Sequence, residues 1–208
     1  DRAYDALEEM IVTLQLAPGS AASEAELSQW LGIGRTPIRE ALQRLSREKL
    51  VQILPRRGVI VSDINVKSQL RLLEVRREID RLVSRSAARR ATSAERGRFD
   101  ALAAAFEGAA RTNDDRAFMR TDHEFNELCV LASRNEFSAA AMRLMHPLSR
   151  RFWYVHYKQA ADMPEAAKLH AAIARSIAAG DEDAAAAATD ALLDNIEAFT
   201  RGTVGADT

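Results

Sequence analysis

The sequence has little cysteine, proline and glycine. Among its 208 residues are one cysteine, five prolines and nine glycines. A single cysteine excludes an internal disulfide framework, a cysteine-rich zinc finger and a cysteine-ligated cluster. Because helix-breaking residues are few and the C-terminal half is rich in alanine, the composition predicts a mostly helical protein.

Strong net charge and long apolar runs are also missing. The 29 Lys and Arg nearly balance the 30 Asp and Glu, so no global field marks a nucleic-acid or membrane binder. No apolar run reaches the ~18 residues that a transmembrane helix needs, yet the hydrophobic content of 47% suffices for a core. We expect a cytoplasmic protein with no membrane partner, built as one large domain or two small ones.

The first 64 residues predict a small N-terminal domain. Ser23 and Glu26 form a capping box at the start of a short helix that Gly32 ends, with Trp30 facing inward. Two β-prone runs joined by a Pro-Arg-Arg-Gly turn predict a hairpin. The expected elements are three helices and this hairpin, at residues 1–16, 24–31, 35–48 and 50–61. This order is typical of a winged helix-turn-helix.

The second domain, residues 65–208, has helical spacing throughout. Thr92 and Glu95 form another capping box, and Pro147 is expected to kink or break the helix that contains it. Helices are expected over residues 66–91, 93–111, 113–133, 136–157, 164–179 and 181–201. The predicted fold class is therefore mainly α, with a winged helix-turn-helix followed by an α-helical bundle.

Positive charge gathers on the third helix and the hairpin. Residues 35–57 contain seven basic and two acidic side chains, a net +5 in a chain whose total is −1. Such a cluster suits the neutralisation of phosphates. Arg35 and Arg39 share a face, where an arginine fork fits the edge of guanine and the hydroxyl of Thr36 suits phosphate. The alternative is a solvated basic helix face.

Three segments carry a family resemblance: residues 32–45 (GIGRTPIREALQRL), 48–51 (EKLV) and 55–59 (PRRGV). They resemble the DNA-binding domain of GntR-family bacterial transcription regulators. The resemblance implies contacts to operator DNA from Arg35, Thr36, Arg39 and Gly58, and the charge pattern adds Arg44 and Arg57. Two positions depart from the family: Gly34 replaces a frequent Ser or Thr cap, and Ala25 replaces an arginine that contacts DNA in some members.

The remainder resembles the FadR-like branch of that family, whose C-terminal FCD domain is an antiparallel helical bundle. The resemblance is carried by Glu74-Val75-Arg76-Arg77, by Asp122, Phe125, Asn126 and Leu128, and by His170, Ile173 and Gly180-Asp181. It implies a domain that binds an effector and dimerises.

The same resemblance implies a divalent metal, Zn or Ni, which many FCD domains hold with one Asp and three His. Asp122 and His170 match this pattern, but Asn126 stands at the first His position and the last falls near Leu192. Because an amide oxygen binds metals and leucine does not, the set Asp122, Asn126 and His170 is incomplete. The alternative is a buried, hydrogen-bonded polar cluster.

Four residues are candidates for effector binding: Arg76, Arg150, Trp153 and His156. Arginines and aromatics at helical spacing over residues 150–157 suit a pocket for an anionic or aromatic small molecule. Arg76 matches an arginine that faces the effector cavity in the family. The alternatives are core packing for residues 150–157 and a surface ion pair between Arg76 and Asp80.

We therefore expect a ligand-responsive transcription regulator, a repressor by resemblance, and not an enzyme. It would bind a pseudo-palindromic operator in double-stranded DNA as a homodimer and sense a small carboxylate-type metabolite. One alternative is a metal-dependent bundle enzyme using Asp122, His170 and His156, which leaves the basic N-terminal domain unexplained. Another is a constitutive DNA binder whose bundle only dimerises.

Overall fold

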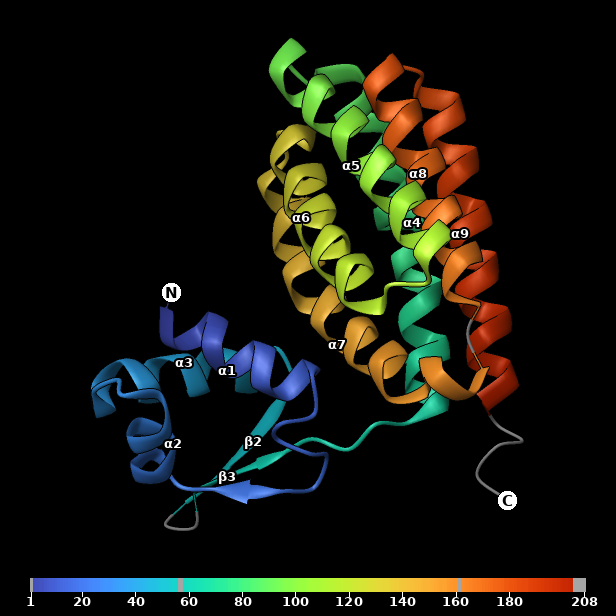
Figure 1. Ribbon diagram of the computed structural model, residues 1–208. Helices are drawn as coiled ribbons and strands as arrows, with labels where there is room; N and C mark the ends of the chain where they lie inside the picture. The colour runs from blue at the N-terminus through green and yellow to red at the C-terminus, as the bar shows by residue number, and fades with distance from the viewer. Residues whose placement is uncertain (1, 56–57, 161, 204–208) are drawn as a thin grey trace. The chain divides into compact units, whose positions relative to one another are not determined.

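The computed structural model describes residues 2–55, 58–160 and 162–203 and divides the chain into two compact units (Figure 1). The first, called the head, comprises residues 1–69 together with residues 143–156. The second, called the bundle, comprises residues 70–142 and 157–208. One long helix, α7 (Glu136–Ala160), contributes residues to both units.

Besides its part of α7, the described part of the head contains three whole helices, α1 (Arg2–Val12), α2 (Glu24–Leu31) and α3 (Arg35–Arg47). The capping box predicted for α2 is present: the Glu26 N–H donates to the Ser23 hydroxyl (3.2 Å) and the Ser23 N–H to the Glu26 carboxylate (2.8 Å). Gly32 ends α2 in the left-handed conformation, with φ of 61°. The short turn that follows leads directly into α3, as in a helix-turn-helix.

Two predictions about these helices are wrong. α1 ends at Val12 instead of residue 16, because Leu14 adopts a φ of 62°, which a right-handed helix cannot include. Trp30 does not face inward but is 57% exposed. α2 has only eight residues and buries Leu27 alone among them, so its inner face is too narrow to take the indole as well.

A three-stranded antiparallel sheet completes the head, in the order β1 (Ala21–Ala22), β3 (Gly58–Val61), β2 (Val51–Leu54). The predicted hairpin is the pair β2–β3, with Val51 opposite Val61. β1 was not predicted and pairs Ala22 with Val59. Val59 and Val61 are buried and alternate with less buried neighbours, so one face of β3 covers the core.

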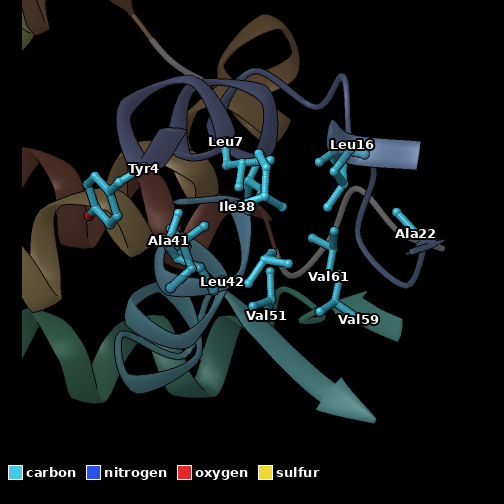
Figure 2. Packing of buried hydrophobic residues seen from close by; sticks show 14 of the residues in the cluster. Tyr4, Leu7, Leu16, Ala22, Ile38, Ala41, Leu42, Val51, Val59 and Val61 are labelled. Atoms are coloured by element: carbon cyan, nitrogen blue, oxygen red, sulfur yellow. The ribbon is translucent and has the colours of Figure 1, made fainter. Parts of the chain in front are cut away.

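The core of the head is aliphatic and lies between α1, α3 and the sheet. Figure 2 shows Leu7 of α1 beside Ile38 of α3, with Leu42 and Val51 below them. Leu7 and Ile38 are fully buried, and Leu148 of α7 packs against the same cluster. This packing fixes α3 by its inner face and leaves its outer face to solvent.

The described residues of the bundle form all or part of six helices. Besides the ends of α7 they are α4 (Val66–Arg90), α5 (Ser93–Thr112), α6 (Asp115–Ser133), α8 (Met163–Ala179) and α9 (Glu182–Gly202). α5 lies between α6 and α8, and α8 also packs on α9 (Figure 1). All six predicted helices are present, but α7 continues through Pro147, so a break there is excluded. A proline removes one N–H from the helical ladder, and the rest of this 25-residue helix holds.

A ladder of ion pairs joins α4 to α9. Arg77 lies 2.7 Å from Asp194, and Arg89 lies 3.6 Å from Glu182. Because the partner number falls as the arginine number rises, the two helices run antiparallel. None of the helices in the described part of the chain has the length and apolar character that crossing a membrane requires.

Candidate nucleic-acid interface and bundle site

The outer face of α3 is polar and exposed. Four apolar residues of the helix are buried, from Ile38 to Leu45. The exposed residues recur at helical spacing: Arg35, Thr36, Arg39, Glu40, Gln43 and Arg47. Gln43 and Arg47 were not among the predicted contact residues, although the same helical spacing identifies them. The structure thus brings Arg35, Thr36 and Arg39 together on one accessible surface.

The N-terminus of α3 is suited to an anion. Its N-cap is Gly34, which has no side chain to accept hydrogen bonds from the first N–H groups. Arg35 and Thr36 follow in the first turn and are exposed. Because unpaired N–H groups and the helix dipole both favour negative charge, this end of α3 offers backbone, hydroxyl and guanidinium donors to a phosphate or a base edge.

Arg39 is held by α2. Its Nη2 lies 2.8 Å from Oε2 of Glu24, and its Nε lies 3.1 Å from both carboxylate oxygens. This hydrogen bonding lowers the pKa of Glu24, and the charges of Arg39 and Arg35 act in the same direction. The pair orients the Arg39 guanidinium at the outer edge of the helix pair. No local sequence pattern indicated this contact, because the partners are 15 residues apart.

Arg44 is engaged inside the head. Its Nε donates to Glu48 (3.2 Å), and its guanidinium carbon lies 3.6 Å from the centre of the Tyr4 ring. The Tyr4 hydroxyl also donates to Glu48 (2.7 Å). Burial raises the pKa of this phenol, and the hydrogen bond and charge of Glu48 raise it further. Arg44 therefore ties α1 to α3, and its contact with DNA stays a prediction.

Gly58 has a structural reason to be glycine. It adopts a φ of 88°, and a Cβ built on it would lie 2.5 Å from the carbonyl oxygen of Ala22. This close approach permits β1 to pair with β3. Arg57, the predicted neighbour of Gly58 at the DNA, lies outside the described residues.

We expect Gly58→Ala to destabilise the protein by about 1–3 kcal/mol, because strained φ and a steric conflict with backbone act together. Gly97→Ala is the matched control, since a Cβ on that glycine of α5 meets nothing within 4 Å and favours a helix. Urea denaturation of both variants measures the difference. Equal midpoints for the two variants would contradict the role given to Gly58.

Asp122, Asn126 and His170 lie together in the bundle. Nε2 of His170 lies 3.2 Å from Oδ1 of Asp122, and the Asn126 amide donates to the same oxygen (3.0 Å). His170 Nδ1 lies 2.7 Å from the carbonyl oxygen of Ala166; since a carbonyl only accepts, Nδ1 carries a proton. Asp122 and His170 are both buried.

These residues do not fit a divalent metal by themselves. The imidazole and the carboxylate contact each other directly, and Asn126 presents its NH₂ group to the carboxylate. Leu192 is apolar and buried. Across the described residues, no three His, Cys, Asp or Glu side chains gather in a way that would hold a metal ion. The arrangement is that of the hydrogen-bonded polar cluster considered above as the alternative.

We therefore expect a chelator such as EDTA to leave the melting temperature unchanged, and elemental analysis to find no stoichiometric Zn or Ni. Asp122→Ala should instead cost about 1–3 kcal/mol of stability, because it removes a hydrogen-bond partner from buried His170. A melting temperature that falls with EDTA and recovers with Zn or Ni would show that the cluster does bind metal.

Aromatic rings surround His170. Its ring centre lies 5.1 Å from that of Phe106, 5.5 Å from Phe118 and 5.9 Å from Phe125. Burial raises the pKa of the nearby Cys129 thiol well above its ordinary value, and the charges of Asp80 and Asp122 add to this. Cys129 is thus a protonated, buried thiol, and the interior around it combines buried charge with aromatic surface.

The predicted effector residues are divided between the units. In the bundle, Arg76 pairs with Asp80 (2.6 Å); both are buried, so the pair is internal and not at the surface. In the head, Arg150 lies 3.4 Å from Glu8 of α1. His156 Nδ1 lies 2.9 Å from the Phe152 carbonyl oxygen, and Trp153 is half-buried. Effector binding by these four residues stays a prediction.

A winged head with an exposed basic helix, followed by an antiparallel helical bundle, defines a DNA-binding transcription regulator. The chain belongs to the GntR family: the model of "Bacterial regulatory proteins, gntR family" matches residues 1–61, and that of the FCD domain matches residues 71–195. The predicted family and fold class are confirmed. The family consists of transcription regulators that bind operator DNA and effectors, not of enzymes.

Three curated relatives illustrate the range of similarity. The galactonate operon transcriptional repressor of Escherichia coli K12 is 28% identical over 209 residues, covering 89% of each chain. The E. coli K12 repressor RspR is 35% identical over 44% of this chain and 40% of its own. A helix-turn-helix regulator from an unstable DNA locus of Streptomyces ambofaciens is 48% identical over 62 residues, only 26% of its own length.

Solved structures share the fold. E. coli McbR/YncC superimposes with a TM-score of 0.84 over 98% of this chain and 97% of its own, at 16% identity. A GntR regulator from Rhodococcus sp. RHA1 gives 0.67 over 97% and 96%, at 20% identity. At these identities the likeness concerns the fold alone.

Proposed function

We propose that this protein is a ligand-responsive repressor that binds a pseudo-palindromic operator as a homodimer in the cytoplasm. α3 lies in the major groove, where Arg35 and Arg39 contact base edges and Thr36 contacts phosphate. A small carboxylate binds in the bundle and changes the affinity of the two heads for their half-sites.

One observation carries this proposal: the face of α3 that the core leaves exposed bears the arginines and the threonine of the GntR motif. A basic helix that is merely solvated would not need two arginines and a threonine grouped on one face at its N-terminus. Gln43 and Arg47 continue the same face, so the reading surface extends along the helix.

The ligand class is supported by the buried polar groups of the bundle and by one relative. Arg76 and His170 are buried cationic or hydrogen-bonding groups of the bundle, each beside a carboxylate, Asp80 or Asp122. Buried groups of this kind are candidates for a ligand site. The relative named for the galactonate operon is a repressor, and galactonate is a carboxylate. We propose a sugar acid or similar small carboxylate as the ligand.

Selection of fragments from the source genome by the purified protein tests operator binding. A selected duplex is then compared with a scrambled duplex by fluorescence anisotropy at one moderate salt concentration. We expect binding to the selected site to be about 10³-fold tighter or more. Equal affinity for both duplexes would refute the proposal.

The same duplex tests the ligand. A panel of sugar acids and other small carboxylates is added, and operator affinity is measured with each. We expect one class to change affinity by about 5–150-fold and to raise the melting temperature of the free protein. Operator affinity that no member of the panel changes would favour the constitutive DNA binder.

A further inference from the structure

Glu24, the first residue of α2, places a negative charge beside the arginines of the exposed face of α3. Its carboxylate accepts three hydrogen bonds from Arg39. These bonds lower the pKa of Glu24, and the charges of Arg39 and Arg35 lower it further, so both arginines act on the same carboxylate. Because a negative charge repels phosphate, a carboxylate at this place on a DNA-binding surface needs a reason.

Folding stability does not supply that reason. The Arg39 side chain is 58% exposed and the Glu24 side chain is 34% exposed, and ion pairs with this much exposure contribute little to stability. The N-terminus of α2 already has the carboxylate of Glu26, which completes the capping box with Ser23. The pair of Glu24 with Arg39 therefore has its main effect on the exposed surface, where DNA would bind.

The hydrogen bonds divide the Arg39 guanidinium into two edges. Nε and Nη2 point toward Glu24, along one side of the planar group. The donors at the tip, on Nη1 and Nη2, make no further hydrogen bond with any residue that the structure describes. Because the five N–H donors of arginine have fixed directions, a carboxylate on the side edge aims the tip, where two N–H groups suit O6 and N7 of guanine.

We propose that Glu24 is a positioning and specificity-determining residue for operator recognition. It aims Arg39 at a base edge, which strengthens binding to the operator. It also offsets the positive charge that would otherwise draw Arg39 to any phosphate, which weakens binding to unrelated duplex. The inference rests on the operator binding of the proposed function, and it names a residue that acts through Arg39.

A double-mutant cycle of Glu24→Ala and Arg39→Ala in the full chain tests the positioning. Fluorescence anisotropy at one salt concentration gives the affinity of each variant for the selected operator and for the scrambled duplex. We expect Glu24→Ala to weaken operator binding by about threefold to tenfold, less than the loss expected when an arginine that reads guanine is removed. In the Arg39→Ala background, Glu24→Ala should no longer weaken operator binding.

The scrambled duplex tests the effect of the charge. Glu24→Ala should bind it about threefold more tightly than wild type does. The salt dependence should steepen by about one released ion for each bound head, since Arg39 can then neutralise a phosphate. Glu9→Ala is the control, because it removes another exposed carboxylate of the head, on α1; it should keep the wild-type ratio of operator to scrambled affinity. Circular dichroism checks that every variant is folded.

The outcomes separate this inference from the proposed function. The inference is overturned if Glu24→Ala keeps wild-type affinity for the operator or binds scrambled duplex no more tightly. It is also overturned if the loss of operator affinity is the same without Arg39, since Glu24 would then act independently of Arg39. Each of these results leaves operator recognition standing. A wild-type chain that binds operator and scrambled duplex alike refutes operator recognition, and this inference with it.

Discussion

Replacing Arg35 with alanine is expected to weaken operator binding by about tenfold to a hundredfold, which corresponds to roughly 1–3 kcal/mol for an arginine that contacts guanine through two hydrogen bonds. Arg35 is exposed in the first turn of α3, and it has no ion pair with any residue that the structure describes. Its removal therefore leaves the head intact. Anisotropy titration of the selected duplex at fixed salt measures the loss.

Two further variants show which kind of contact is lost. Arg116→Ala removes an exposed arginine of α6 and should leave affinity unchanged. Arg35→Lys keeps the charge but not the planar fork. Compared with Arg35→Ala, it should recover wild-type affinity for random duplex but not for the operator. If Arg35→Lys restores operator affinity in full, Arg35 contacts phosphate and does not read a base. If Arg35→Ala binds the operator as well as wild type does, α3 is not the reading helix.

The parts of the fold that were predicted correctly depend on neighbours in sequence. Ser23 with Glu26, and Thr92 with Glu95, are three residues apart, and both capping boxes formed. The helical periods of the bundle gave its helices to within a few residues, because the buried face of a helix repeats every turn. The exposed face of α3 followed from the same logic.

What the sequence did not reveal depends on partners far along the chain. β1 is two alanines with no strand signal, and it exists because β3 offers a free edge, with the paired residues 37 and 39 positions later in the chain. The charge of Arg44 suits a contact with DNA, yet its guanidinium lies over the ring of Tyr4, 40 residues earlier in the chain. For the same reason the direct contact of Asp122 with His170 was visible only as one of two alternatives.

The largest effect on stability is expected at Arg151 of α7, a residue that no motif identified. Its side chain is almost fully buried at 2% exposure. The guanidinium donates to the carbonyl oxygens of Leu50 and Ser62, which stand just before β2 and just after β3. Burial lowers the pKa of Arg151 to about 10, while the charge of Asp63 acts in the opposite direction. At neutral pH the guanidinium remains charged and holds the residue before β2 to the residue after β3, an arrangement called here the clamp.

Arg151→Ala should therefore cost about 3–5 kcal/mol, because it opens a cavity and removes the side-chain donor to the Ser62 carbonyl, while the Leu50 carbonyl keeps the Ser62 N–H (3.0 Å). Arg151→Met fills most of the space and should cost less, so the difference between the two separates packing from hydrogen bonding. Arg143→Ala, an exposed arginine on the same helix, is the control. Urea denaturation gives all three values, and a loss for Arg151→Ala no larger than that of the control would contradict the clamp.

The contacts that α7 makes in the head also predict the stability of a fragment without that helix. A fragment of residues 1–69 lacks Leu148, Arg150 and Arg151, which contact the head core, Glu8 and the hairpin ends in the whole chain. Because it loses all three contacts at once, the fragment should unfold at lower urea than the Arg151→Ala full chain. A fragment as stable as the wild-type head would show that α7 contributes nothing to it, and that the hairpin is held by its own strands.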